Sequence, residues 1–132
     1  MDARDTVRAY YAALRAGEPL GPFFADPREG DGPAVKFGIS ERLVGVDAIR
    51  DGLREQTATT TDWTVESRAL RLTERERHAW FSDVVGLGWT DTEDGARREF
   101  ETRWSGTLER RATGDGQAWR FVGMHVSVAA EL

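Results

Sequence analysis

The stretch that decides the fold is Ala118–Ala129, which reads AWRFVGMHVSVA. Its length and its β-branched and aromatic residues predict a strand that is covered on both faces. Because side chains alternate along a strand, two sets should face opposite ways. We expect the first set to face a core or cavity and the second to lie against another layer, such as a second subunit. The first set is Trp119, Phe121, Gly123, His125 and Ser127, and the second is Arg120, Val122, Met124, Val126 and Val128.

Long β-rich segments precede this strand, and short polar turns separate them, so neighbours should pair antiparallel. With Arg110 opposite Trp119, the aromatic faces of the last two strands coincide. In this register Trp104 faces His125. A slip of one residue would bring Arg103 beside His125 instead, and we prefer the first register because it separates charge from the core. The earlier segments are Asp62–Leu72, His78–Thr92 and Arg98–Arg110.

Helical signals fill the first half of the chain. Apolar residues recur there at helical spacing, between residues that favour helix caps and turns. The expected helices are Ala3–Ala16, begun by Asp2 or Asp5 and ended by Gly17; a short helix opened by Pro19 and running through Phe24; and Ala48–Thr57, capped by Asp47. Short strands are expected at Ala34–Ser40 and Arg42–Val44. Helices followed by a meander of strands predict an α+β fold.

Composition limits the function. The 132 residues suit a single domain over residues 1–132, and no apolar run approaches the length of a membrane span. The net charge of −5 disfavours nucleic acid as a partner. The chain has no cysteine and two distant histidines, so we expect no disulfide, no metal and no cofactor. A cytoplasmic location is expected, since cysteine and a signal peptide are both absent.

Three passages together resemble the SnoaL-like family of the nuclear transport factor two-like superfamily. They are VRAYYAALRAGEPLGPFFAD (Val7–Asp26), LVGVDAIRDGL (Leu43–Leu53) and WRFVGMHVS (Trp119–Ser127). The resemblance implies an α+β cone, with three N-terminal helices packed on the concave face of a curved, mostly antiparallel sheet. It does not imply one function, because the superfamily includes isomerases, cyclases, dehydratases, carriers and oligomerisation domains.

Asp83 and His125 are the candidate proton-transfer residues. Asp83 alternates with apolar residues in its strand, so it should be paired, raised in pKa or directed into a wet cavity, unless the strand twists and exposes it. His125 is either a hydrogen-bonded core residue or a pocket donor or base, and its ordinary pKa suits both roles. The two would form a donor–acceptor pair if they lay close together.

Tyr10 matches, by resemblance, the tyrosine that holds an oxyanion in steroid isomerases of the superfamily. Those enzymes also need an aspartate base after the second helix. The corresponding stretch here, AVKFGIS, contains Lys36 but no carboxylate before Glu41. The isomerases' second oxyanion donor also has no clear match, so we do not expect isomerase activity.

Five tryptophans are more than core filling explains, so some should line a cavity or a dimer interface. We predict that a small, partly apolar molecule binds in that cavity. The alternatives are an enzyme of the polyketide cyclase or isomerase kind that uses Asp83 or His125, and a structural dimerisation module. A homodimer should form over Val122, Met124 and Val126. The expected pocket residues are Tyr10, Phe24, Trp63, Asp83, Trp104 and His125.

Overall fold

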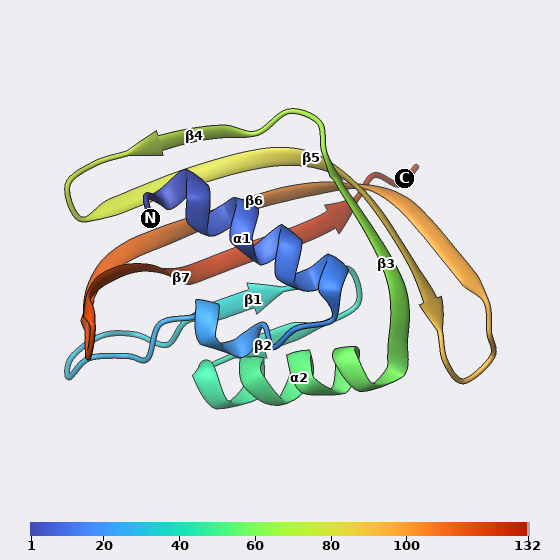
Figure 1. The fold of residues 1–132 in the computed structure, drawn as a ribbon, viewed down its shortest axis with the longest axis horizontal. Coiled ribbons are helices and arrows are strands. Elements are labelled where there is room, and N and C mark those ends of the chain that lie inside the picture. The colour runs from blue at the N-terminus through green and yellow to red at the C-terminus, as the bar shows by residue number, and fades with distance from the viewer. Residues whose placement is uncertain (132) are drawn as a thin grey trace.

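The computed structural model describes residues 1–131. They form two α-helices that pack against one curved β-sheet, most of whose strands are long (Figure 1). The predicted α+β architecture is therefore confirmed. The elements in chain order are α1 (Ala3–Ala16), the short 3-10 helix η1 (Gly21–Phe23), β1 (Val35–Phe37), β2 (Arg42–Val44), α2 (Val46–Thr59), β3 (Thr60–Ser67), β4 (Arg71–Glu74), β5 (His78–Asp91), β6 (Arg97–Thr113) and β7 (Gly116–Val128).

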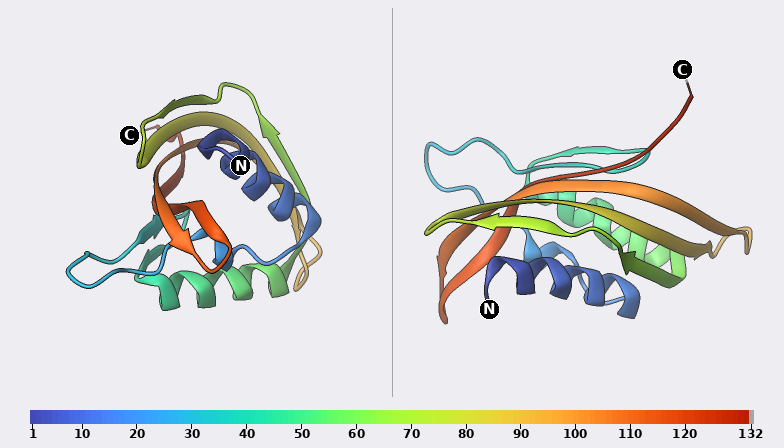
Figure 2. Two further views of the ribbon diagram at one scale, coloured as in Figure 1. Left: turned by 60° about the vertical axis from the view of Figure 1, so that its left-hand side comes forward. Right: turned by 90° about the horizontal axis from the view of Figure 1, so that it is seen from above.

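The sheet has the strand order β2-β1-β7-β6-β5-β3, and β4 pairs with the other end of β5. Only β1 and β7 run parallel, so the sheet is mostly antiparallel, as predicted. Figure 2 shows α1 inside the curve of the sheet and α2 across its open side. The predicted single strand over Asp62–Leu72 is instead two strands, because the chain leaves the sheet between Ser67 and Arg71.

α1 begins and ends where its sequence indicates. The Asp2 side chain accepts a hydrogen bond from the Asp5 amide at 2.7 Å, and the Asp5 side chain accepts one from the Asp2 amide at 3.2 Å. Gly17 ends the helix in the left-handed conformation, with φ of 70°. The face that packs on the sheet consists of Ala3, Thr6, Val7, Tyr10, Tyr11, Ala13 and Leu14.

The other two predicted helices differ from those observed. η1 is a single 3-10 turn, so residues 1–131 contain two α-helices and not three. The chain extends at Phe24, which bridges to Phe121, and this contact with β7 ends the turn. α2 begins at Val46, earlier than predicted. Gly45 precedes its first turn, and Asp47 lies inside that turn, where its charge still favours the helix dipole.

The β6–β7 hairpin starts in the predicted register and then leaves it. Val122 is an extra residue in β7 with no partner on β6. Such a bulge reverses the alternation of all later side chains. Trp104 therefore lies opposite Val126 and not opposite His125, and Ser105 is the partner of His125.

Gly106 on β6 accommodates this bulge. A Cβ atom at Gly106 would lie 2.7 Å from the carbonyl oxygen of Gly123 and 2.7 Å from the Phe81 ring. A side chain at this position would force backbone or ring to move. The glycine thus allows β7 and Phe81 to approach β6 from two sides.

Two predictions about β7 were wrong because of this bulge. The His125 side chain lies on the outer face, where its ring packs on Phe37 with centroids 5.6 Å apart. Met124 and Val126, which we expected under a second subunit, are buried in the core. The slipped register is not found either, because Arg103 stays exposed.

The core lies between α1 and the sheet and is rich in aromatic residues. Tyr10 sits at its centre and meets Phe23, Phe24, Trp104 and Phe121 edge-on, with ring centroids 5.4 to 6.1 Å apart. No helix within residues 1–131 is both long and apolar enough to cross a membrane.

Candidate functional site

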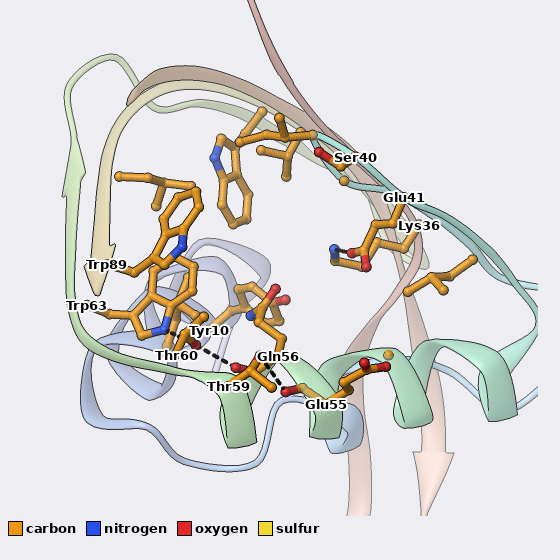
Figure 3. Close-up of a pocket in the computed structure, with 18 residues that line it drawn as sticks. Tyr10, Lys36, Ser40, Glu41, Glu55, Gln56, Thr59, Thr60, Trp63 and Trp89 are labelled. Carbon is orange, nitrogen blue, oxygen red and sulfur yellow. Dashed lines mark hydrogen bonds and ion pairs between the residues drawn. The ribbon is translucent and has the colours of Figure 1, made fainter. Parts of the chain in front are cut away.

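A cavity of about 450 Å³ lies between α1, α2, the β1–β2 hairpin and the concave face of the sheet (Figure 3). This volume falls in the range of small-molecule sites. The cavity is chemically divided: indole rings from β3 and β5 form one side, and charged side chains of the hairpin form the other. α2 contributes polar residues along the edge between them.

Three tryptophans line the apolar part of the cavity, together with aliphatic side chains of α1, β2, β5 and β7. Trp63 and Trp89 stack with centroids 4.9 Å apart and ring planes 26° apart. The Trp63 indole N–H donates to the Thr60 hydroxyl at 2.9 Å. Trp104 is buried deeper, and its N–H donates to the Thr102 hydroxyl at 2.9 Å. Both N–H groups already have partners, so these indoles offer apolar ring surface to the cavity.

Lys36 and Glu41 form an ion pair on the opposite side of the cavity (Figure 3). The Lys36 Nζ atom lies 2.5 Å from Glu41 Oε1. Lys36 is the middle residue of β1, paired with Leu43 on β2 and Met124 on β7, and only 6% of its side chain is exposed. The Glu41 side chain is 33% exposed. The cavity therefore holds a buried cation whose counter-ion is partly in water.

Tyr10 lines the same cavity from α1. None of the hydrogen bonds formed within residues 1–131 involves its hydroxyl group. Burial, together with the nearby charge of Glu41, raises the pKa of Tyr10 above the ordinary tyrosine value. The hydroxyl therefore stays protonated at physiological pH and can donate a hydrogen bond to a bound molecule.

Asp83 is buried on the concave face but does not line the cavity. Its Oδ2 atom accepts hydrogen bonds from the Tyr11 hydroxyl at 2.9 Å and the Ser67 hydroxyl at 2.6 Å. Its Oδ1 atom accepts one from the Ala69 amide at 2.9 Å. Burial and the Asp83 charge raise the pKa of Tyr11. The carboxylate thus joins α1 to the corner where the chain leaves β3.

The structure divides the six residues predicted for the site. Tyr10, Trp63 and Trp104 line the cavity. Phe24 lies in the core, packed against Phe121 with ring centroids 5.6 Å apart. Asp83 is engaged elsewhere, and His125 lies on the outer face. The proposed Asp83–His125 pair is therefore not formed.

Sequence reasoning missed the charged side of the cavity. Lys36 is the chain's only lysine, and it sits between two apolar residues in a short strand, which was the available signal. Lys36 is buried in β1, whereas Phe37 is exposed and Val35 is only partly buried, so the inward position belongs to the charged residue. Glu41 was recognised only as the next carboxylate along the chain. Trp89 is one of the five tryptophans of which some were expected to line a cavity, although it was not among the six named pocket residues. Gln56 and Thr60 carried no signal that separated them from other helix and strand residues.

The curved sheet, the enclosed helix and the cavity between them define the α+β cone class of protein. The chain belongs to the SnoaL-like domain family, which matches residues 3–131. This confirms the resemblance found in its three sequence passages. No curated protein matches the chain.

Several solved structures share the fold. A candidate dehydratase of the NTF2-like family from Streptomyces avermitilis superposes with a TM-score of 0.81 at 15% identity, over 97% of this chain and 94% of that one. A nuclear transport factor 2-like superfamily protein from Salmonella enterica gives 0.77 at 16% identity, over 96% and 88%. A candidate scytalone dehydratase from Novosphingobium aromaticivorans gives 0.76 at 14% identity, over 96% and 81%. At such low identities the likeness concerns the fold alone.

Proposed function

We propose that the chain binds a small, partly apolar molecule in the cavity between its helices and its sheet. The cavity itself carries this proposal, because its volume of about 450 Å³ is that of a small-molecule site and apolar rings and a few polar groups line it together. The stacked Trp63 and Trp89 rings provide a surface for an apolar ring, and the Tyr10 hydroxyl provides a hydrogen-bond donor. A purely structural dimerisation module would have no need for such a space.

Titration with the neutral fluorescent dye N-phenylnaphthylamine tests this proposal. We expect saturable binding of one dye per chain. Gln56→Trp, which places an indole in the cavity from α2, should abolish binding. Arg54→Trp on the exposed face of the same helix is the matched control and should bind as the wild type does. A dye that still binds to the Gln56→Trp variant would contradict the proposal.

A second candidate function is proton transfer in the same cavity. The earlier candidates Asp83 and His125 do not line it, but Glu41 does, and its charge acts on the Tyr10 hydroxyl. Tyr10 would donate a hydrogen bond to a carbonyl oxygen while Glu41 accepts a proton from the adjacent carbon. We rank it second because Lys36 already engages the Glu41 carboxylate.

Proton NMR in deuterium oxide tests the second candidate. A panel of aromatic ketones would be followed for exchange of the protons next to the carbonyl. An enzyme should accelerate this exchange, and Glu41→Gln and Tyr10→Phe should each remove the acceleration. Arg54→Trp should keep it. Exchange no faster than in buffer, across the panel, would exclude this reaction for these substrates and leave the binding function.

We further propose that the chain forms a homodimer through the outer face of β1, β2 and β7. Two of the residues first expected there, Met124 and Val126, are buried, but Phe37 and Val44 are 40% and 42% exposed on this side. Sedimentation velocity at micromolar concentration should show a dimer, and Phe37→Glu should give a monomer with unchanged circular dichroism. A monomeric wild type would overturn this.

The absence of cysteine supports a cytoplasmic location for the protein.

A further inference from the structure

The two members of the Lys36–Glu41 pair are buried to very different degrees. Lys36 is fixed in β1 between two strands, and water reaches only 6% of its side chain. Glu41 follows a surface turn and is about one third exposed. If the pair separates, the Glu41 carboxylate can be hydrated by water. The Lys36 ammonium group stays buried, and an unpaired buried charge raises the free energy of the protein unless another anion replaces Glu41. The carboxylate is therefore the exchangeable member of the pair.

The turn before Glu41 is built to let its side chain fold back. A Cβ atom at Gly38 would lie 2.6 Å from Glu41 Cγ and 2.7 Å from Glu41 Oε1. The Gly38 amide also donates to the Glu41 carbonyl at 3.0 Å, which closes the turn. Glycine at position 38 thus leaves the path open along which Glu41 reaches Lys36. Any other residue there would push the flexible end of Glu41 away from the ammonium group.

The most buried charge in the cavity is positive, although two carboxylates and one ammonium group line it. Within residues 1–131, Lys36 is the only basic residue that lines the cavity, and it is the most buried charge there. The acidic lining residues, Glu41 and Glu55, are both more accessible to water. A cationic molecule that entered fully would meet the buried ammonium, whereas an anionic group could replace Glu41 there.

We propose that the cavity selects a flat apolar molecule bearing one carboxylate or sulfonate group, and that this group displaces Glu41 from Lys36. In the free protein Glu41 holds the position that the anion of the ligand takes. On binding, Glu41 turns into water, and the apolar body of the ligand lies toward Trp63 and Trp89 (Figure 3). This inference rests on the proposed binding function and adds to it the charge of the ligand.

A pair of dyes with the same rings tests the proposal. Anilinonaphthalene sulfonate is anionic, and N-phenylnaphthylamine is its neutral parent. The quantity measured is the ratio of their affinities at fixed low salt. Glu41→Gln should raise this ratio about tenfold, because the sulfonate no longer competes with a carboxylate for Lys36. Lys36→Met should lower the ratio about tenfold. The neutral dye is measured with each variant so that any general change in the cavity cancels in the ratio.

Gly38→Ala provides a test that alters neither charge. It should displace Glu41 and raise the ratio in the same direction as Glu41→Gln, so the proposal stays testable even if Lys36→Met fails to fold. Gly114→Ala, whose added methyl group meets open space, and Glu101→Gln on the exposed surface are the matched controls and should leave the ratio unchanged.

The results of the dye titrations distinguish a failure of this inference from a failure of the proposed binding function. If the wild type binds neither dye, the proposed function itself fails. If the neutral dye binds but Glu41→Gln and Gly38→Ala leave the ratio unchanged, only the displacement of Glu41 is overturned. Anionic dye that still binds to Gln56→Trp would occupy another surface, and that result would also overturn the proposal.

Discussion

The carboxylate of Asp83 receives hydrogen bonds from a tyrosine, a serine and a backbone amide at the corner between β3 and β4. Each of its oxygen atoms has at least one donor, and the side chain is buried outside the cavity. A carboxylate satisfied in this way stabilises the fold, because removing it leaves the donors without acceptors. Its burial on an apolar strand face is therefore explained without a catalytic role.

Asp83→Ala should lower the free energy of unfolding by about 3 kcal/mol, since three hydrogen bonds are lost and the Tyr11 hydroxyl is left unpaired inside the protein. Tyr11→Phe removes one of these bonds together with its donor and should cost about 1 kcal/mol. Urea denaturation followed by tryptophan fluorescence measures both values. Equal losses in the two variants would show that the bonds to Ser67 and Ala69 contribute nothing.

The raised pKa values of the two buried tyrosines determine how the free energy of unfolding should change at alkaline pH. Tyr10 and Tyr11 are the only tyrosines in the chain, and burial is the main cause that raises the pKa of each. Because the pKa is higher in the folded than in the unfolded state, their contribution to stability is complete below about pH 10 and is lost as pH rises above it.

We therefore expect the free energy of unfolding to fall above pH 10, with a slope of up to about 1.4 kcal/mol per pH unit for each tyrosine. The near-ultraviolet absorbance of tyrosinate should appear only as the protein unfolds. The chain in concentrated urea is the reference and should titrate near pH 10. Tyrosinate absorbance at pH 10 in a protein that is still folded would contradict the expected burial.

In β7, a single bulged residue determines which way the side chains of the rest of the strand point. Val122 reverses the facing of every later side chain in the strand, and Gly106 makes room for the bulge on β6. Gly106→Ala should lower the free energy of unfolding by about 2 kcal/mol or more, because its methyl group would meet backbone and the Phe81 ring. Gly114→Ala is the control and should change little. Urea denaturation of both variants checks this, and equal stabilities would mean that β7 shifts freely.

The same bulge explains why the sequence predicts the fold better than the site. Strand and helix positions follow from periodicity and caps, and these were largely correct. A bulge leaves no mark in periodicity, so alternation was carried through Val122 and placed His125 inside. Lys36 was missed for a related reason: its burial depends on β7, where its partner Met124 lies far along the chain.

At the scale of the whole molecule, the two helices are attached to the sheet to different extents. α1 buries seven residues against the concave face, whereas α2 buries only Ile49 and Leu53. α2 and the β1–β2 hairpin, which bury few of their own side chains, close one side of the cavity. A ligand that touches Lys36 on the hairpin and Trp63 on β3 would therefore add contacts between the hairpin and the rest of the sheet.

Local stability should follow this division, because segments with few buried contacts open at lower free energy than the core. In hydrogen exchange followed by mass spectrometry, amides of α2 should exchange faster than those of α1 in the free protein. Saturation with a dye that binds in the cavity should slow exchange in α2 and the β1–β2 hairpin and leave α1 nearly unchanged. Gln56→Trp with the same dye is the control and should show no slowing beyond that of the variant alone. Equal protection of the two helices in the free protein would show that the contacts of α2 hold it as firmly as the core holds α1.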